Sequence, residues 1–304
     1  MSKSNQLRVD DLRAIWRLVG ECRDLGDDRI AWRDRWVAGL SDLVDADIGL
    51  AGEMAGCHEL MMHDLGVTFW WRPGTLDLAT LMGHLAEFRS DPRYSPAMIE
   101  YFRRFREQDG LCLPRTGFID DKAWYRSSDY RLIQEPFGAD ATLWCSRKID
   151  GAPEGETTNV ILLRTSGRRD FRPRELAIVH EAHATLAPLV GGALARYADP
   201  SPSHLSPRLR QVLDCLLQGD GDKQVAARLG LAPATINDYT KALYRHFGVR
   251  GRSELMARWI RRGWGHRPGP ADPARPAGMT VIGSGYGASF YENHRFGAGP
   301  AGRP

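Results

Sequence analysis

The sequence predicts two folded domains: an α+β domain over residues 1–198, then an all-α domain of four short helices over residues 205–264. Three observations lead to this prediction. Up to about residue 197, apolar residues recur with both helical and strand-like spacing. From residue 205 only helical spacing is present, and after residue 264 Gly and Pro dominate. A chain of 304 residues has room for two such domains, joined here by the Pro- and Ser-containing linker 199–204.

The N-terminal domain mixes both kinds of spacing. Leu12, Ile15 and Val19 predict a first helix, and Val67-Thr68-Phe69-Trp70-Trp71, stopped by Pro73-Gly74, is the strongest strand signal. In chain order we expect helices at 10–24 and 28–45, a strand at 47–51, a loop or weak strand at 53–58, a strand at 67–71, helices at 76–88 and 96–107, an irregular stretch at 110–138 with helical turns near 120–125 and 130–134, strands at 141–148 and 158–165, and a helix from 173 to about 197. Pro188 should end or kink that helix.

The C-terminal domain has clear helix boundaries. Ser206-Pro207 starts the first helix, because a capping residue before a Pro at the first helical position is a strong start signal. Asp222 can cap the second helix, which Gly230 ends. Pro233 begins a third helix that runs to about Phe247, and Ser253 caps a fourth. A short helix, a Gly-containing turn and a longer helix with a polar face form a helix-turn-helix pattern.

The third helix divides into two faces at about 100° per residue. One face carries the apolar side, which must pack on the small core: Ile236, Thr240, Leu243 and Phe247. The opposite face carries hydrogen-bonding groups, with two more on the flanks: Asp238, Lys241 and Arg245, then Asn237 and Thr235. A reader of the DNA major groove needs such a face, although an ordinary helical subdomain could also present it to solvent.

The whole segment resembles the LuxR-type (FixJ/NarL-type) DNA-binding domain. The residues that carry the resemblance are Leu205-Ser206-Pro207-Arg208, Gln211-Val212-Leu213, Lys223-Gln224-Val225-Ala226, Leu229-Gly230-Leu231, Thr235-Ile236, Tyr244-Arg245, Phe247-Gly248-Val249 and Arg252-Ser253-Glu254-Leu255. The resemblance implies double-stranded DNA as partner, contacted at phosphate by Lys223 and at or near the groove by Thr235, Asn237, Asp238, Lys241 and Arg245. It also implies a homodimer on DNA, for which the fourth helix offers Leu255, Met256 and Trp259, with Ile260 beside them.

This chain departs from the family pattern at four positions. Leu209 replaces the usual Glu and breaks the capping box from Ser206. Ala232 stands at the cap of the third helix in place of Ser or Thr, a loss of about 1 kcal/mol of helix stability. Asn237 and Tyr239 replace the usual Lys and His, so the base preference should differ from the commonest one.

The N-terminal domain resembles sensory domains of GAF or PAS type more loosely. The resemblance rests on Pro136-Phe137-Gly138, the strands that follow, and Phe171-Arg172-Pro173-Arg174-Glu175-Leu176. It implies control by a signal, with a small-molecule ligand of unknown identity as one option. Trp70, Trp71, Tyr101, Phe102, Phe105, Trp124 and Tyr125 could line a pocket for it, although a domain of this size also needs such side chains as core.

Charge is distributed unevenly. The net charge is only +3, but residues 205–264 hold eleven Lys or Arg against five Asp or Glu, a net of +6. Residues 266–304 add +2, which leaves −5 for residues 1–204. The basic surplus therefore lies on the proposed DNA reader, where phosphate contact requires it.

Other features exclude several classes. Five scattered cysteines without a C-x-x-C pair, no apolar leader and no membrane-length apolar run favour a soluble cytoplasmic protein. Cys57, His58 and His63, or His180 and His183, could suggest a metal, but the zinc-protease spacing is absent and we expect no cofactor. Without a catalytic constellation the sequence predicts no enzyme. A sensor whose helices mediate protein association, or an enzyme with a DNA-binding module, are the alternatives.

The tail at residues 265–304 has few aliphatic side chains. Burial there cannot offset the conformational entropy of the chain, so we expect this tail to be disordered.

Overall fold

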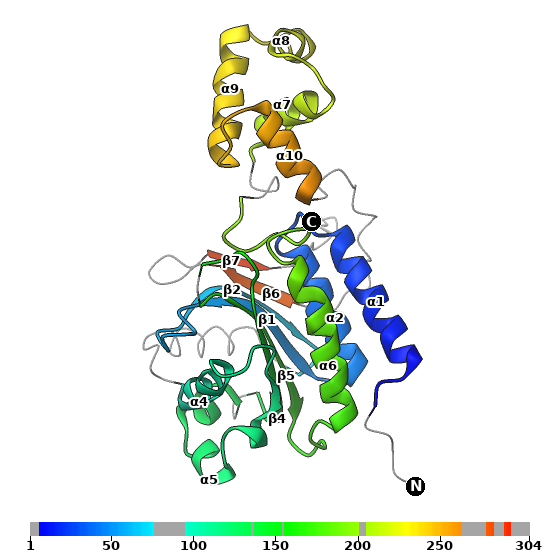
Figure 1. The fold of residues 1–304 in the computed structure, drawn as a ribbon, viewed down its shortest axis with the longest axis vertical. Helices are drawn as coiled ribbons and strands as arrows, with labels where there is room; N and C mark the ends of the chain where they lie inside the picture. The colour runs from blue at the N-terminus through cyan, green and yellow to red at the C-terminus, as the bar shows by residue number, and fades with distance from the viewer. Residues whose placement is uncertain are drawn as a thin grey trace, which may run out of the picture.

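The computed structural model describes residues 6–75, 95–134, 137–153, 155–200, 205–262, 278–282 and 289–292. Figure 1 shows an α+β domain built on one sheet, with a separate cluster of four helices beyond one end of it. The predicted fold class, α+β followed by all-α, is confirmed.

The sheet is antiparallel throughout and has the strand order β3-β4-β5-β1-β2-β6-β7. The strands of the N-terminal domain are β1 (Ile48–Ala55), β2 (His63–Trp71), β3 (Cys112–Pro114), β4 (Ala139–Lys148) and β5 (Thr157–Thr165). Strand β1 lies in the interior between β2 and β5, so its backbone is paired on both sides. This double pairing explains why β1 extends through Glu53 to Ala55, where the sequence predicts only a loop or weak strand.

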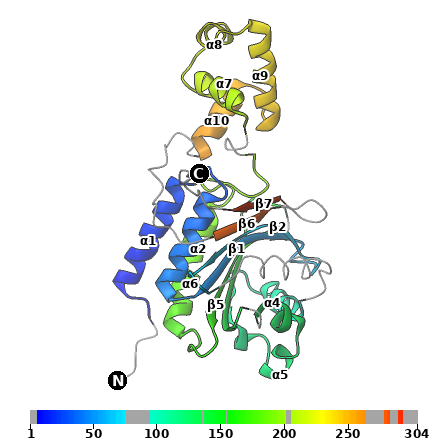
Figure 2. The same cartoon turned by 180° about the vertical axis from the view of Figure 1, so that it is seen from behind.

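Helices cover both faces of the sheet. Figures 1 and 2 show α1 (Val9–Asp24), α2 (Ala31–Val44) and α6 (Pro173–Leu186) on one face, and α4 (Pro96–Phe105) and α5 (Asp121–Trp124) on the other. The first layer encloses an aliphatic and tryptophan core that includes Trp36, Leu40 and Leu162. An aromatic cluster under α4 and α5 includes Tyr101, Phe102 and Trp124. Short turns complete the domain at Arg115–Gly117, Tyr130–Gln134 and Ala187–Leu189.

The prediction that Pro188 ends the last helix of the N-terminal domain is confirmed, although no second helical segment follows it before residue 200. Helix α6 ends at Leu186, and Pro188 lies in the 3-10 turn that follows, because a proline has no N–H for the next helical hydrogen bond. Residues 190–200 then run without a helix, so the expected helix to residue 197 is wrong beyond its first half. The helix expected at 76–88 lies outside the described residues.

The C-terminal tail contributes two strands where the sequence predicts disorder. β6 (Gly278–Ile282) pairs with β2 from Val67↔Val281 to Trp70↔Gly278, and β7 (Ser289–Glu292) pairs with β6. Composition misses this hairpin because Gly and Pro dominate the surrounding tail. Locally, the β-branched and aromatic residues of both strands favour extended backbone, and the edge of β2 supplies a row of pairing groups.

The helical domain consists of α7 (Pro207–Leu217), α8 (Asp222–Leu229), α9 (Pro233–His246) and α10 (Arg252–Arg262), which confirms the four predicted helices. Ser206 caps α7 by accepting the N–H of Leu209 at 3.3 Å, whereas Ala232 gives α9 no side-chain cap. One apolar cluster joins all four helices and includes Val212, Val225 and Leu255. Among the described helices, none is long and apolar enough to cross a membrane.

Candidate DNA-binding surface and cavity

Helix α9 divides into two faces as its sequence predicts. Ile236, Leu243 and Phe247 are completely buried, and Thr240 is nearly so. Every side chain predicted to read the groove is on the other side: Asn237, Asp238, Lys241 and Arg245 are exposed, and Thr235 is half-buried. The exposed face is therefore free of any role in the domain core.

The turn between α8 and α9 fixes their relative orientation. Gly230 has φ of 65°, a left-handed conformation that ends α8 without the strain a side chain would cause. The N–H of Leu231 closes the turn by donating to the carbonyl oxygen of Ala226 at 3.0 Å. Lys223 is exposed on α8, the shorter helix that precedes α9.

Several arginines of the domain are occupied in structural hydrogen bonds. Arg252 donates to the carbonyl oxygens of Leu216 at 2.6 Å and Asp220 at 2.7 Å. Arg228 forms a 2.8 Å ion pair with Asp220, and Arg258 donates to the carbonyl oxygen of Phe247. The side chains of Lys223, Lys241 and Arg245 form no hydrogen bond or ion pair with the part of the chain that the structure describes. The basic surplus thus separates into structural arginines and exposed cations.

The residues of α10 that are predicted to form dimer contacts differ in how deeply they are buried. Leu255 is completely buried in the domain core, so it packs the helix rather than a partner. Met256 and Trp259 are half-buried, and the Trp259 ring meets Phe247 edge-on at 6.5 Å. Ile260 is 75% exposed because the helix extends beyond the core it covers. Of the group, Met256, Trp259 and Ile260 leave surface accessible to another chain.

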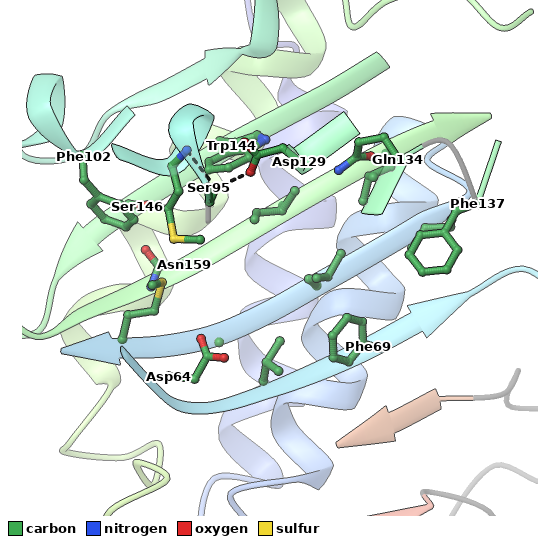
Figure 3. A pocket seen from close by; sticks show the side chains of 18 residues that line it. Asp64, Phe69, Ser95, Phe102, Asp129, Gln134, Phe137, Trp144, Ser146 and Asn159 are labelled. Atoms are coloured by element: carbon green, nitrogen blue, oxygen red, sulfur yellow. Dashed lines mark hydrogen bonds between the residues drawn. The ribbon is translucent and has the colours of Figure 1, made fainter. Parts of the chain in front are cut away.

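A cavity of about 140 Å³ lies on the sheet face opposite α1, α2 and α6. Figure 3 shows its floor formed by strands and its cover by residues such as Ser95 and Asp129. Most of its lining is apolar: Ile48, Leu50, Met54, Val67, Phe69, Met98, Phe102, Phe137, Ile161 and Leu163. An apolar body of matching size would be desolvated here.

Polar groups occupy specific points of the cavity wall. The Asp129 carboxylate accepts the hydroxyl of Ser95 and, at 3.0 Å, the N–H of Ala97 in the first turn of α4. Burial raises the pKa of Asp129, although these two donors act in the opposite direction. Gln134 Oε1 and Trp144 Nε1 are buried without a hydrogen-bond partner among the described residues. One unpaired acceptor and one unpaired donor thus lie in the lining, where a bound molecule could satisfy them.

The aromatic set proposed from the sequence is mostly core. Phe102 lines the cavity, whereas Tyr101, Phe105 and Trp124 pack in the aromatic cluster and Trp70 in the helical layer. Tyr125 is 43% exposed, and Trp71 is buried outside the cavity lining. Sequence reasoning missed Phe69, Phe137 and Trp144. The period-two alternation of each strand could have indicated which side chains share the cavity face, but not that α4 would cover it.

The histidine and cysteine side chains that the structure describes do not come together at one site. His183 is buried beside Cys145, with Nδ1 3.4 Å from its Sγ, while His180 is exposed. Burial lowers the pKa of His183 to about 3, so its ring is neutral. Burial raises the pKa of Cys57 to about 12. Among the described residues, no group of three or more His, Cys, Asp or Glu side chains could hold a metal ion.

The helical domain matches a known family. The profile described as "Bacterial regulatory proteins, luxR family" matches residues 203–258. A "Probable HTH-type transcriptional regulator GfsR" from Streptomyces halstedii is 37% identical over 71 residues, which are 23% of this chain and 29% of that protein. The chain therefore aligns with less than a third of this relative's length.

Solved structures give weaker likenesses. Escherichia coli SdiA is 11% identical with a TM-score of 0.28, covering 74% of this chain and 87% of its own. SdiA in complex with octanoyl-rac-glycerol is 13% identical with a TM-score of 0.34, covering 86% and 99%. The VqsR LBD domain from Pseudomonas aeruginosa is 12% identical with a TM-score of 0.36, covering 59% and 99%. TM-scores of this size do not establish a common fold.

Proposed function

We propose that this chain, whose residues 203–258 are a regulatory domain of the luxR family, is a sequence-specific DNA-binding transcriptional regulator controlled by its N-terminal domain. The observation that carries the proposal is the division of α9 into a buried face and a polar, exposed one. Asn237, Asp238 and Lys241 would meet base edges in the major groove, with Thr235 beside them. Arg245, one turn further along, and Lys223 on α8 would contact phosphates.

The proposed active form is a homodimer on DNA. A single module of this size reads few base pairs, so two half-sites would sharpen specificity. Met256, Trp259 and Ile260 provide the accessible apolar surface on α10. Leu255 supports that surface from inside the domain.

The proposed signal is a small molecule that is mainly apolar and carries a polar group. The cavity supports this class because its wall is largely aliphatic and aromatic. The polar group would accept from Trp144 and donate to Gln134, the two described residues of the cavity lining that have a buried side-chain atom without a hydrogen-bond partner. A strongly anionic ligand fits less well, since Asp64 and Asp129 both line the cavity.

The DNA-binding proposal is tested by selection of the full-length chain on a random duplex pool at low salt. We expect the selection to enrich one sequence motif. For each phosphate that the protein neutralises, the logarithm of the binding constant should fall by about 0.9 for every tenfold rise in salt concentration. Failure of the wild-type chain to retain any duplex would refute the proposal.

The ligand proposal is tested by thermal-shift screening of amphiphilic small molecules against the full chain. A binder should raise the Tm of the wild type and leave Leu50→Trp unchanged, because the larger side chain fills the cavity that Leu50 lines. Equal shifts in both proteins would place the molecule elsewhere.

A further inference from the structure

Strand β1 separates the cavity from a buried ionic cluster. Successive side chains of a strand point to opposite faces, and Ile48, Leu50, Gly52 and Met54 all line the cavity. Glu53, between the last two, lies on the face covered by α2 and is completely buried. If a molecule in the cavity displaces Gly52 or Met54, it therefore also moves the peptide units on either side of Glu53.

Glu53 holds the segment that leaves the domain. Its carboxylate forms an ion pair with the buried Arg33 and accepts the backbone N–H of Tyr197 at 3.2 Å. Arg196 Nε lies 3.9 Å from the same carboxylate. Arg33 also donates to the carbonyl oxygen of Ala195 at 3.0 Å. The guanidinium of Arg33 lies over the Tyr197 ring, 3.9 Å from its centroid.

Strand β2 makes a second attachment to the same segment. The hydroxyls of Thr68 and Tyr197 are 2.8 Å apart. A Cβ at Gly66 would lie 2.5 Å from the Tyr197 ring, so only glycine permits the ring to approach the strand this closely. Val67 and Phe69, which alternate with Gly66 and Thr68, line the cavity. Both strands under the cavity therefore hold Tyr197 from their opposite face.

Tyr197 is eight positions before Leu205, the first residue of the helical-domain core. The chain at Ala195 is anchored further by its N–H, which donates to the carbonyl oxygen of Gly26 at 2.7 Å. A buried ion pair is a weak source of stability, because desolvation offsets most of its attraction. Its hydrogen bonds are directional, however, and they fix where Tyr197 sits relative to β1 in a way that apolar packing would not.

We propose that Glu53 is a positioning residue that couples occupancy of the cavity to the start of the interdomain linker. An occupant that displaces Gly52 and Met54 changes the hydrogen bond between Glu53 and the Tyr197 N–H. The position of the chain that leads to the helical domain then changes as well. This inference rests on the proposed control of DNA binding by the N-terminal domain. The coupling is reciprocal, so DNA binding should in turn change affinity for the occupant.

The test uses the full chain and the Leu50→Trp substitution as an internal occupant of the cavity. Hydrogen exchange at the Tyr197 amide is the readout, because that N–H is bonded to Glu53. Leu50→Trp should change its exchange rate at least about tenfold in the wild-type background and less than twofold with Glu53→Gln, the nonadditivity that marks coupling. Glu156→Gln is the matched control, because Glu156 pairs with Arg196 but does not hold Tyr197; it should leave the effect of Leu50→Trp intact.

Two results would overturn the coupling: no change of Tyr197 exchange in Leu50→Trp, or the same change with and without Glu53. Far-UV circular dichroism checks that each variant is folded. If Glu53→Gln does not fold, Tyr197→Phe replaces it, since it keeps the ring and removes only the bond to Thr68; the tenfold response should then shrink. Exchange is measured without DNA, so failure of the DNA-binding proposal leaves this test readable.

Discussion

Arg252 and Leu216 are joined by a 2.6 Å hydrogen bond from the guanidinium of α10 to a carbonyl oxygen in the last turn of α7. A helix leaves its last carbonyl groups without partners, and Arg252 satisfies two acceptors at this end of α7. This arginine therefore belongs to the fold of the reader domain. Arg245 carries the same charge on the exposed face of α9 and has no such role.

Removal of the two arginines should affect different properties: stability for Arg252 and DNA affinity for Arg245. Arg252→Ala should lower the free energy of unfolding by about 1–3 kcal/mol, because it removes two hydrogen bonds from a charged donor to carbonyl oxygens. Arg245→Ala should change stability by less than about 0.5 kcal/mol and weaken binding to all sequences alike, lowering the salt slope by about one unit. Urea unfolding and salt titrations of DNA binding on the same samples measure both effects. Equal losses of stability would contradict the assignment.

Base preference should depend on a different part of the same helix. Asn pairs best with adenine and Asp can accept from the cytosine amino group, so Asn237→Ala and Asp238→Ala should each relax preference by about 1–3 kcal/mol per lost base contact. Asp238 would also repel phosphate, so it is tolerated only deep in the groove or beside Lys241 or Arg245. Binding-site selection with each variant measures this. If Arg245→Ala alters the selected sequence while Asn237→Ala does not, the helix is rotated from the proposed orientation.

The reader domain was predictable because its signals are local. Ser206-Pro207, Gly230 and Pro233 mark helix ends within a few residues of where the structure has them. The order of strands in the sheet was not predictable in this way. β1 pairs with β5, more than a hundred residues later in the chain, and nothing in either segment specifies that partner.

The candidate functional residues also divide into those that local sequence signals predict and those that depend on tertiary contacts. The exposed set on α9 follows from helical periodicity, whereas the cavity requires knowing that α4 covers the sheet. Glu53 illustrates the difficulty best, because an isolated Glu in a weak strand suggests a surface position. Its partners Arg33 and Tyr197 are 20 and 144 residues away, and only the tertiary structure makes a buried charge tolerable there.

The dimer proposal predicts a specific effect at Ile260. Replacing this 75% exposed side chain by Glu should leave the monomer folded, since it lies outside the domain core, yet it would bring two like charges together if α10 packs against its copy. We expect loss of the two-half-site footprint and a single protein per duplex by sedimentation. Ala257→Glu, which adds the same single charge at another exposed position of α10, is the control for charge alone. A footprint unchanged by Ile260→Glu would move the dimer contact elsewhere.

The buried His183 should make stability fall in acid. Its pKa is lowered by burial from 6.5 to about 3, so between these values protons bind the unfolded chain preferentially. The stabilisation is complete above pH 6.5 and is lost as the pH falls toward 3, on the order of 3 kcal/mol between pH 7 and pH 4. His183→Leu removes the titrating group and should give a shallower pH dependence of unfolding in urea. Identical slopes in the two proteins would show that other groups control the acid response.

The hairpin of the tail should protect the edge of the sheet. Val281 pairs with Val67 in the register of β6 on β2, so Val281→Pro removes an N–H and fixes a backbone angle within that pairing. We expect faster hydrogen exchange along β2 and concentration-dependent association, because an uncovered strand edge offers its backbone groups to other chains. Val281→Thr keeps the N–H and the β-branched shape and should behave as wild type. If β2 exchanges equally in all three proteins, the hairpin does not cover this edge in solution.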